Sequence, residues 1–185
     1  METFVKKGEL VASPEIMSLT LAKANSNIEH DDSDDLLQLL LDGAMSEAES
    51  YTGISIKKRN VTIGFSEWAK KLVLPYHPVN EITNVSYIDA NGESQDLETT
   101  DYKLYSYDNG LTERVLIMFT DFPALEEDNP FPISVEAVMG YDEVPSDIKQ
   151  AILLIFSHNE LYREDAPIKL DRSSRAKLRP YRVDR

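Results

Sequence analysis

The side chains best suited to chemistry in this chain are three histidines and two acidic clusters. His30, His77 and His158 lie far apart in the sequence, and none belongs to a recognised zinc-binding motif. A lone histidine beside apolar positions, such as His158, is better explained as a packing or surface residue. The chain has no cysteine, which excludes disulfides and thiolate metal sites and suits a reducing compartment.

The first acidic cluster occupies residues 31–35 and invites comparison with a calcium-binding loop. An EF-hand loop needs glycine at its sixth position and glutamate at its twelfth. Counted from Asp31, these positions hold Leu36 and Asp42, so the cluster does not match. The simpler interpretation is that its carboxylates cap free N–H groups at a helix start and complement the helix dipole.

The second acidic cluster lies in the proline-rich segment 121–132, and such loops are usually solvated. The chain also lacks the GxSxG, GxxxxGK[ST] and GxGxxG patterns of hydrolases and nucleotide-binding proteins. The sequence therefore predicts no catalytic, cofactor-binding or metal-binding residue, and a protein that is not an enzyme.

The first cluster must be positioned by a long helix, predicted over residues 31–53. Its apolar residues recur at steps of three and four, which places them on one face. They are Leu37, Leu40, Leu41, Ala44, Ala48 and Tyr51. Gly53 follows the last of them and can take the left-handed conformation that ends a helix.

Two further helices are predicted. A short one begins at Ser13 and Pro14, or alternatively at Ser18 or Thr20, and ends near Asn25. A second long helix runs from about residue 144 to residue 165. Its apolar face includes Ile148, Ile152 and Ile155. We expect the two long helices to pack together, with the short helix beside them.

The region between the long helices predicts five to seven short antiparallel strands. Hairpin turns are expected at residues 89–92 and 108–110, because Asn-Gly accepts positive φ. Residues 1–12 are predicted as an arm or a short extended piece. The fold class is therefore α+β, with a helical hairpin (13–53), an antiparallel β insert (54–143), a long helix packed on the hairpin (144–165) and an extended basic arm (166–185).

Charge is distributed unevenly along the chain. The net charge is −14, and general adhesion to nucleic acid or anionic lipid is not expected because phosphate binding depends on Lys and Arg. Residues 166–185, in contrast, hold seven basic and two acidic residues, which predicts either an interaction arm or a solvated tail. No apolar run is long enough for a signal peptide or a membrane span, so no membrane partner is expected.

Four short motifs follow one another in a specific order. They are Tyr51-Thr52-Gly53, Leu74-Pro75-Tyr76-His77-Pro78-Val79, Gly140-Tyr141-Asp142-Glu143-Val144-Pro145 and Leu178-Arg179-Pro180-Tyr181-Arg182-Val183. With the helices, they span about residues 13–183. In this order and spacing the chain resembles the head–tail connector (adaptor) proteins of tailed bacteriophages, which are often grouped under head-completion or DNA-packaging names.

The resemblance implies a structural protein of the virion neck, made in the host cytoplasm, that forms a ring of about twelve copies under the portal vertex. The ring joins the filled capsid to the tail and continues the channel through which genomic DNA passes without specific binding. Implied partners are the portal protein, other copies of the chain, and a downstream neck or tail-completion protein. No cofactor is implied.

Three groups of residues are expected to serve this role. The portal-binding arm comprises Arg175, Leu178, Arg179, Pro180, Tyr181, Arg182 and Val183. The helices that build the ring use Leu37, Leu40, Leu41, Ala44, Ile148, Ile152 and Ile155. The carboxylates that could face the channel, as the bolder alternative to helix capping, are Asp31, Asp32, Asp34 and Asp35.

Two other functions are compatible with the sequence. An acidic protein that mimics DNA or regulates a nucleic-acid-binding partner would fit the net charge. A small metal-dependent hydrolase would need a clustered polar pocket, and the motifs show none.

Overall fold

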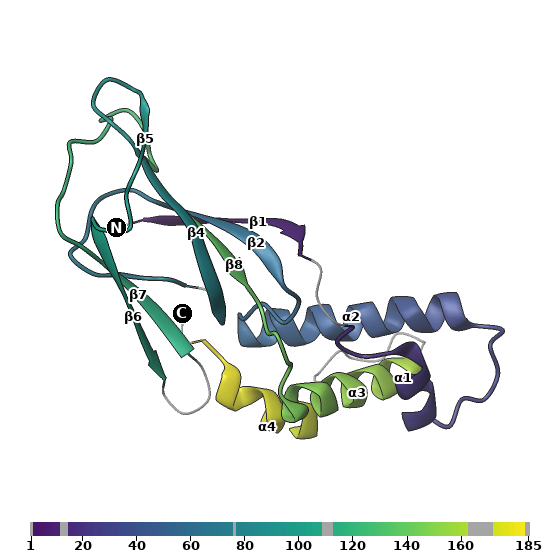
Figure 1. Ribbon diagram of the computed structural model, residues 1–185. Helices are drawn as coiled ribbons and strands as arrows, with labels where there is room; N and C mark the ends of the chain where they lie inside the picture. Colours follow the sequence, from purple (N-terminus) through teal and green to yellow (C-terminus); the bar gives the residue numbers. More distant parts are fainter. Residues whose placement is uncertain (1, 12–14, 76, 109–112, 163–171, 184–185) are drawn as a thin grey trace. The chain divides into compact units, whose positions relative to one another are not determined.

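The computed structural model describes residues 2–11, 15–75, 77–108, 113–162 and 172–183. Within them lie four α-helices, one 3₁₀ helix and eight strands in two antiparallel sheets (Figure 1). The prediction of a mixed α+β chain is therefore confirmed. The chain divides into two compact units. We call Met1–Ala12 with Lys57–Tyr141 the β unit, and Ser13–Ile56 with Asp142–Arg185 the helical unit.

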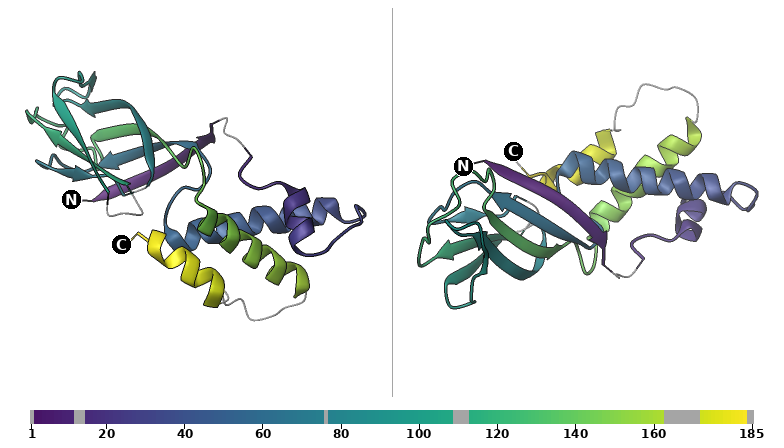
Figure 2. Two further views of the ribbon diagram at one scale, coloured as in Figure 1. Left: turned by 60° about the horizontal axis from the view of Figure 1, so that its bottom comes forward. Right: turned by 90° about the horizontal axis from the view of Figure 1, so that it is seen from above.

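The helical unit is built on two long helices. Its elements are α1 (Leu19–Asn25), α2 (Asp34–Thr52), α3 (Ser146–Leu161), α4 (Arg172–Leu178) and the 3₁₀ helix η1 (Arg179–Tyr181). Helices α2 and α3 lie side by side and antiparallel, and α4 packs against α3 (Figure 2). Fully buried side chains such as Leu37 and Leu41 on α2 and Phe156 on α3 form the interior of this unit.

Local sequence signals explain where these helices begin and end. Helix α1 starts after Ser18, whose side chain accepts a hydrogen bond from Leu21 N at 3.2 Å. This is the alternative start; the start at Ser13 is wrong, because Ser18 provides the cap and residues 15–18 are not helical. Helix α2 ends at Gly53, which has φ of 74°, as the sequence predicted.

The β unit contains two sheets that share one core. The larger has the order β1-β2-β8-β4-β5 and the smaller β3-β7-β6. The strands are β1 (Thr3–Leu10), β2 (Arg59–Phe65), β3 (Leu72–Val73), β4 (Val79–Ile88), β5 (Ser94–Asp96), β6 (Tyr102–Asp108), β7 (Glu113–Phe119) and β8 (Ile133–Met139). One buried cluster includes Ile63 and Val135 from the larger sheet and Leu72 and Ile117 from the smaller.

Both predicted hairpins are present. Strands β4 and β5 pair antiparallel across the turn that holds Asp89, whose carboxylate accepts hydrogen bonds from Asn91 N at 2.8 Å and Glu93 N at 3.1 Å. These two N–H donors, with Gln95, hold the pKa of the Asp89 carboxyl below its usual value. Strands β6 and β7 form the second hairpin, whose turn at 109–112 lies outside the described residues.

The two ends of the chain compare differently with the prediction. Residues 3–10, predicted as an arm or a short extended piece, are extended and form strand β1, which pairs with β2 in the larger sheet. The extended C-terminal arm is wrong for the described residues 172–183, which form α4 and η1. Leu178 and Tyr181 are buried in the helical unit, and this burial stabilises a helical turn where the sequence suggested an extended arm. Residues 163–171 and 184–185 lie outside the described residues.

Replacement of two different glycines by alanine tests the backbone geometry of the fold. Gly140 has φ of 125°, and a Cβ there would lie 2.6 Å from the carbonyl oxygen of Lys57, whereas a Cβ on Gly43 of α2 would meet nothing within 4 Å. We expect G140A to lower the free energy of unfolding by about 3 kcal/mol or more, and G43A to raise it by about 0.5–1 kcal/mol. Urea titration of both variants measures these changes. Equal effects of the two substitutions would contradict the backbone geometry.

Candidate interaction surfaces

The part of the chain that the structure describes shows no catalytic constellation. Among those residues, no three His, Asp or Glu side chains gather as a metal site would require. Likewise, none of the helices in the described ranges combines the length and the apolar character that crossing a bilayer demands.

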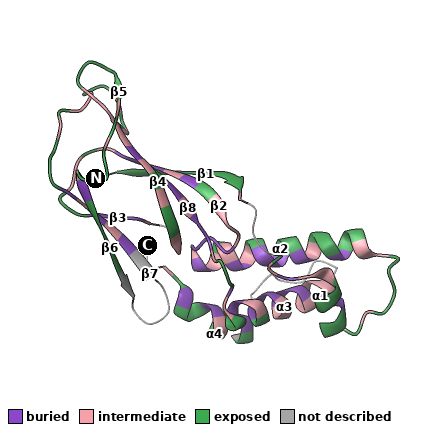
Figure 3. Ribbon diagram, in the orientation of Figure 1, coloured by how far each residue is buried: buried purple, intermediate pink, exposed green. Residues whose placement is uncertain are grey.

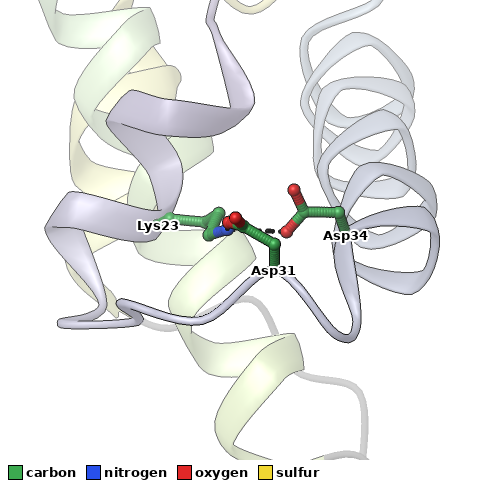
Figure 4. Close-up of polar contacts among 3 residues, drawn as sticks. All are labelled: Lys23, Asp31 and Asp34. Carbon is green, nitrogen blue, oxygen red and sulfur yellow. Dashed lines mark hydrogen bonds and ion pairs between the residues drawn. The ribbon is translucent and has the colours of Figure 1, made fainter.

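The sharpest polar feature is an ion-pair cluster where α1 meets the start of α2. The Lys23 ammonium donates to Asp31 Oδ1 at 2.5 Å and to Asp34 Oδ1 at 2.7 Å (Figure 4). Only 10% of the lysine side chain is exposed, compared with 87% for Asp31 and 40% for Asp34. One cation from α1 thus links the loop before α2 and the first turn of α2.

This cluster shifts the pKa values of Lys23 and Asp31. Hydrogen bonds from Lys23 are the main reason that the pKa of the Asp31 carboxyl lies below its usual value. Hydrogen bonds to Asp31 and Asp34, in turn, raise the pKa of the Lys23 ammonium. Both shifts keep the pairs charged at neutral pH, so the cluster acts as an electrostatic latch that fixes α1 against α2.

The acidic cluster therefore does not cap the helix as predicted. The N-cap of α2 is Ser33, and its side chain makes no capping hydrogen bond. Asp31 and Asp34 are engaged by Lys23 because a nearly buried ammonium needs a counter-charge more than the solvated end of a helix does. Asp32 and Asp35 remain exposed, and Asp34 and Asp35 lie in the first turn, where they complement the helix dipole.

A cavity of about 460 Å³ lies beside the latch. Apolar side chains, including Leu19 and Ile28, line it together with Glu29 and the three residues of the latch. Its lining residues include no serine, histidine or cysteine. The sequence did not predict this cavity, because nothing in it distinguished Lys23 from the other residues of the short first helix.

Helix α2 carries a second apolar strip outside the face that packs in the unit. Leu36 and Leu39 are 42% and 67% exposed, and Leu40 is half-buried. With Gly43 they follow helical spacing, so they lie together on the side turned away from Leu37, Leu41 and their neighbours. Figure 3 shows this contrast as buried and exposed colours alternating around α2.

The residues expected on the ring-building helices lie in the interior of the helical unit. Leu37, Leu41, Ala44, Ile148, Ile152 and Ile155 are all buried inside the helical unit, and only Leu40 is partly exposed. They hold the helices of one chain together. The exposed leucines of α2, Leu36 and Leu39, lie outside this interior, and periodicity alone did not separate them from the core.

The C-terminal residues form an amphipathic helical segment. Ser174, Leu178 and Tyr181 point inward at helical spacing and are buried, whereas Arg175 and Arg179 are exposed on the opposite side. Pro180 and Arg182 are exposed as well, and Val183 is half-buried.

This segment is fixed at the end of the helical unit where α2 ends and α3 begins. Val183 N donates to Thr52 O at 2.8 Å, and the Arg182 guanidinium lies 5.7 Å from the centre of the Tyr51 ring. Lys177 pairs with Asp147 of α3 at 3.5 Å. Burial, with a smaller effect of the Asp147 charge, raises the pKa of the Tyr181 hydroxyl. The sequence Leu178–Val183 is thus an anchored element with an arginine-rich outer side.

Sequence comparison links the chain to one family. The family model described as "Phage gp6-like head-tail connector protein" matches residues 16–116, which is more than half of the chain. No curated protein matches the sequence.

The fold is also similar to that of chains from gene transfer agent (GTA) particles. The chain is similar to one from the neck of an empty GTA particle computed with C6 symmetry, with a TM-score of 0.75, 17% identity, and coverage of 98% of this chain and 96% of that one. It is equally similar to a chain in the virion of a native gene transfer agent particle, with a TM-score of 0.75, 16% identity and the same coverage. A chain from the neck of a native GTA particle computed with C12 symmetry has a TM-score of 0.69, 19% identity, and coverage of 97% and 96%. At these identities the likeness shows a shared fold.

The latch predicts a specific response to acid. Since the folded pKa of Asp31 is lowered, the stability it contributes is present above the ordinary value of 3.8 and is lost as pH falls through the lowered pKa. In K23M the latch carboxylates repel each other at neutral pH, and protonation relieves this repulsion. We therefore expect K23M to melt below the wild-type temperature at pH 6, with the difference shrinking toward pH 2.5. Circular dichroism at 222 nm measures both melting curves.

K149M, which changes a lysine on α3, is the control and should melt with the wild type at both pH values. If the difference in melting temperature between K23M and the wild type does not change with pH, the latch is ruled out.

Proposed function

Because the chain belongs to the phage gp6-like head–tail connector family, we propose that it forms a closed ring in the neck of a tailed phage or a phage-like particle. The ring lies under the portal, joins the DNA-filled head to the tail and continues the DNA channel. The family is one of structural connectors, which is not an enzyme class.

The observation that carries the ring proposal is the apolar strip on α2. A monomer gains nothing from exposing Leu36 and Leu39 on one side of a helix whose opposite side is already buried. A neighbouring copy that covers this strip would remove apolar surface from water at about 25 cal/mol per Å². If the strip meets an unlike surface of the neighbour, the contact is heterologous and repeated rotation closes a ring.

The copy number is proposed from the similar structures. Those chains come from necks computed with C6 and with C12 symmetry, and both symmetries are compatible with rings of copies related by rotation about the DNA axis. A ring of about twelve copies accommodates both symmetries. The same neighbours support a location in the virion neck, reached by assembly in the host cytoplasm.

We place portal docking on the arginine-rich outer side of α4 and η1. Arg175, Arg179 and Arg182 are exposed with Pro180, and arginine is one of the residue types enriched among those that dominate interface energy, because its guanidinium forms multidentate hydrogen bonds. Leu178 and Tyr181, which were expected to take part directly, instead hold the segment in place from within. The opposite edge of the ring is then free for a downstream neck or tail-completion protein.

We propose that fewer carboxylates face the channel than the sequence suggested. A DNA conduit favours an acidic wall that phosphates do not grip. Asp31 and Asp34 are compensated by Lys23, so their negative charge is partly cancelled. Asp32 and Asp35 are exposed carboxylates with no such compensation from Lys23, and we propose that these two face the DNA.

Electron microscopy of the purified chain, alone and mixed with its portal protein, tests the ring. We expect closed rings or ring density added to the portal. Leu39→Glu should abolish this assembly while the circular dichroism spectrum stays unchanged, because the added carboxylate would be buried without a partner. Gln38→Glu is the matched control, since it adds the same charge to the neighbouring exposed position of α2. Assembly that survives L39E would show that the strip is not the subunit contact.

Charge reversal tests the portal contact. The double variant R175E/R179E should fold normally and form rings, yet bind the portal at least tenfold more weakly by biolayer interferometry, because two favourable ion-pairing cations become repulsive. K70E/K71E reverses two exposed lysines of the β unit and serves as the control. Truncation before residue 166 is unsuitable because it also removes buried Leu178 and Tyr181. Unchanged portal affinity in R175E/R179E would place docking elsewhere.

A further inference from the structure

The two sheets of the β unit have four edge strands, which differ in length. Strands β3 and β5 are edges of two and three residues, too short to offer much backbone. Strands β1 and β6 are edges of eight and seven residues, one in each sheet. Along β6, and along β1 from Thr3 to Lys7, the N–H and C=O groups of alternate residues are directed away from the sheet, which is the arrangement that accepts another strand. Between Lys7 and Leu10 the register of β1 with β2 shifts.

Strand β6 has the features of an edge prepared for a partner. It pairs with β7 in seven consecutive residue pairs without a register shift, so its outer edge is straight. Leu104 and Tyr105 are 50% and 47% exposed. Leu104 lies on the same face as Tyr102, which is buried in the core of the β unit, so the core stops short of Leu104.

Strand β1 is held almost entirely by its backbone. Of its eight residues only Val5 is half-buried, and the other seven are exposed, as Figure 3 shows by colour. Phe4 contacts Phe131 of the same unit with ring centres 5.7 Å apart. Such a strand gains little from side-chain burial in the isolated chain, and a strand added on its outer side would hold it from both edges.

We propose that β1 of one copy pairs with β6 of the next copy, so that the larger sheet of one subunit continues into the smaller sheet of its neighbour around the ring. This inference rests on the proposed ring. Each copy then contributes one β1 edge and one β6 edge to two different neighbours, which makes the contact heterologous. In a closed ring all long edges are paired, which removes the aggregation hazard that free edges present.

Charge and ring geometry favour this pairing over the pairing of like edges. Strand β1 carries Lys6, Lys7 and one glutamate, whereas β6 carries one lysine and one aspartate and is neutral overall. Two β1 strands side by side would bring four lysines together, and edge lysines are a known means of preventing such contacts. Two β6 strands side by side would form an isologous contact, which gives a dimer and cannot continue around a ring. Pairing of β1 with β6 avoids both outcomes.

The absence of native cysteine makes crosslinking a direct test. Lys6→Cys is combined in turn with Lys103→Cys, Leu104→Cys, Tyr105→Cys or Ser106→Cys, which samples the possible registers. Opposed residues on paired strands lie within disulfide-forming distance. After mild oxidation of the assembled ring, we expect at least one pair to give a ladder of covalent oligomers that collapses to monomer on reduction. Each single-cysteine variant should give no product larger than a dimer.

A control pair of cysteines and electron microscopy distinguish failure of the β1–β6 pairing from failure of the ring. Lys6→Cys combined with Gln95→Cys places the second thiol on the short β5 edge, and no ladder is expected there. Rings seen by electron microscopy without a β1–β6 ladder in any of the four pairs would overturn the inference and leave the ring proposal standing. If neither rings nor ladders form, with or without portal protein, the proposed function fails and the strand pairing fails with it.

Discussion

Burial of one side of α2 against α3 is the interaction on which the helical unit depends. An isolated helix of 19 residues is marginal in water, and most of its stability must come from the packed face that Leu37, Leu41 and Ala44 provide. That face meets a helix from the other end of the sequence, so the unit forms only when its two chain segments come together. Because one face of α2 is fully used within the chain, its opposite side, with Leu36 and Leu39, is left for contacts outside it. The same constraint that stabilises the unit therefore defines the surface available for assembly.

Ion pairing with Lys23 divides the acidic residues at the start of α2 into compensated and uncompensated carboxylates. A strongly acidic protein needs its negative charge placed where it does not destabilise packing, and Lys23 meets this need by joining two carboxylates to α1. The latch also orients the loop that carries Asp32, so compensated and uncompensated carboxylates alternate along one short segment. At the other end of α2, the Arg182 guanidinium lies against Tyr51 of the last turn, and Lys177 pairs with Asp147 at the start of α3. Acidic side chains therefore lie at the start of α2, and basic side chains lie near its end.

Much of the architecture could be predicted from periodicity and turn chemistry. The long helices, Gly53 as a stop and both hairpins follow from spacing and from residues that accept positive φ. The pairing of β1 with β2 could not be recognised, because a strand with seven exposed residues shows no apolar alternation. The helical form of residues 172–181 was missed for a related reason, since Leu178 and Tyr181 are too few to outweigh a run of arginines in a local pattern. Lys23 was overlooked because its role depends on a loop that brings Asp31 back to α1, and such non-local pairing leaves no sequence signature.

The division of the helical unit into two chain segments has a consequence for its synthesis. These segments, Ser13–Ile56 and Asp142–Arg185, are separated in the sequence by the larger part of the β unit. Because a chain is made from its N-terminus, α2 leaves the ribosome well before α3 and the segment that holds Tyr181. The β unit can fold during this interval, whereas the apolar face of α2 has no partner until the second segment has been made. The nascent chain therefore exposes an apolar helix face that must be protected from aggregation while the β unit is being synthesised.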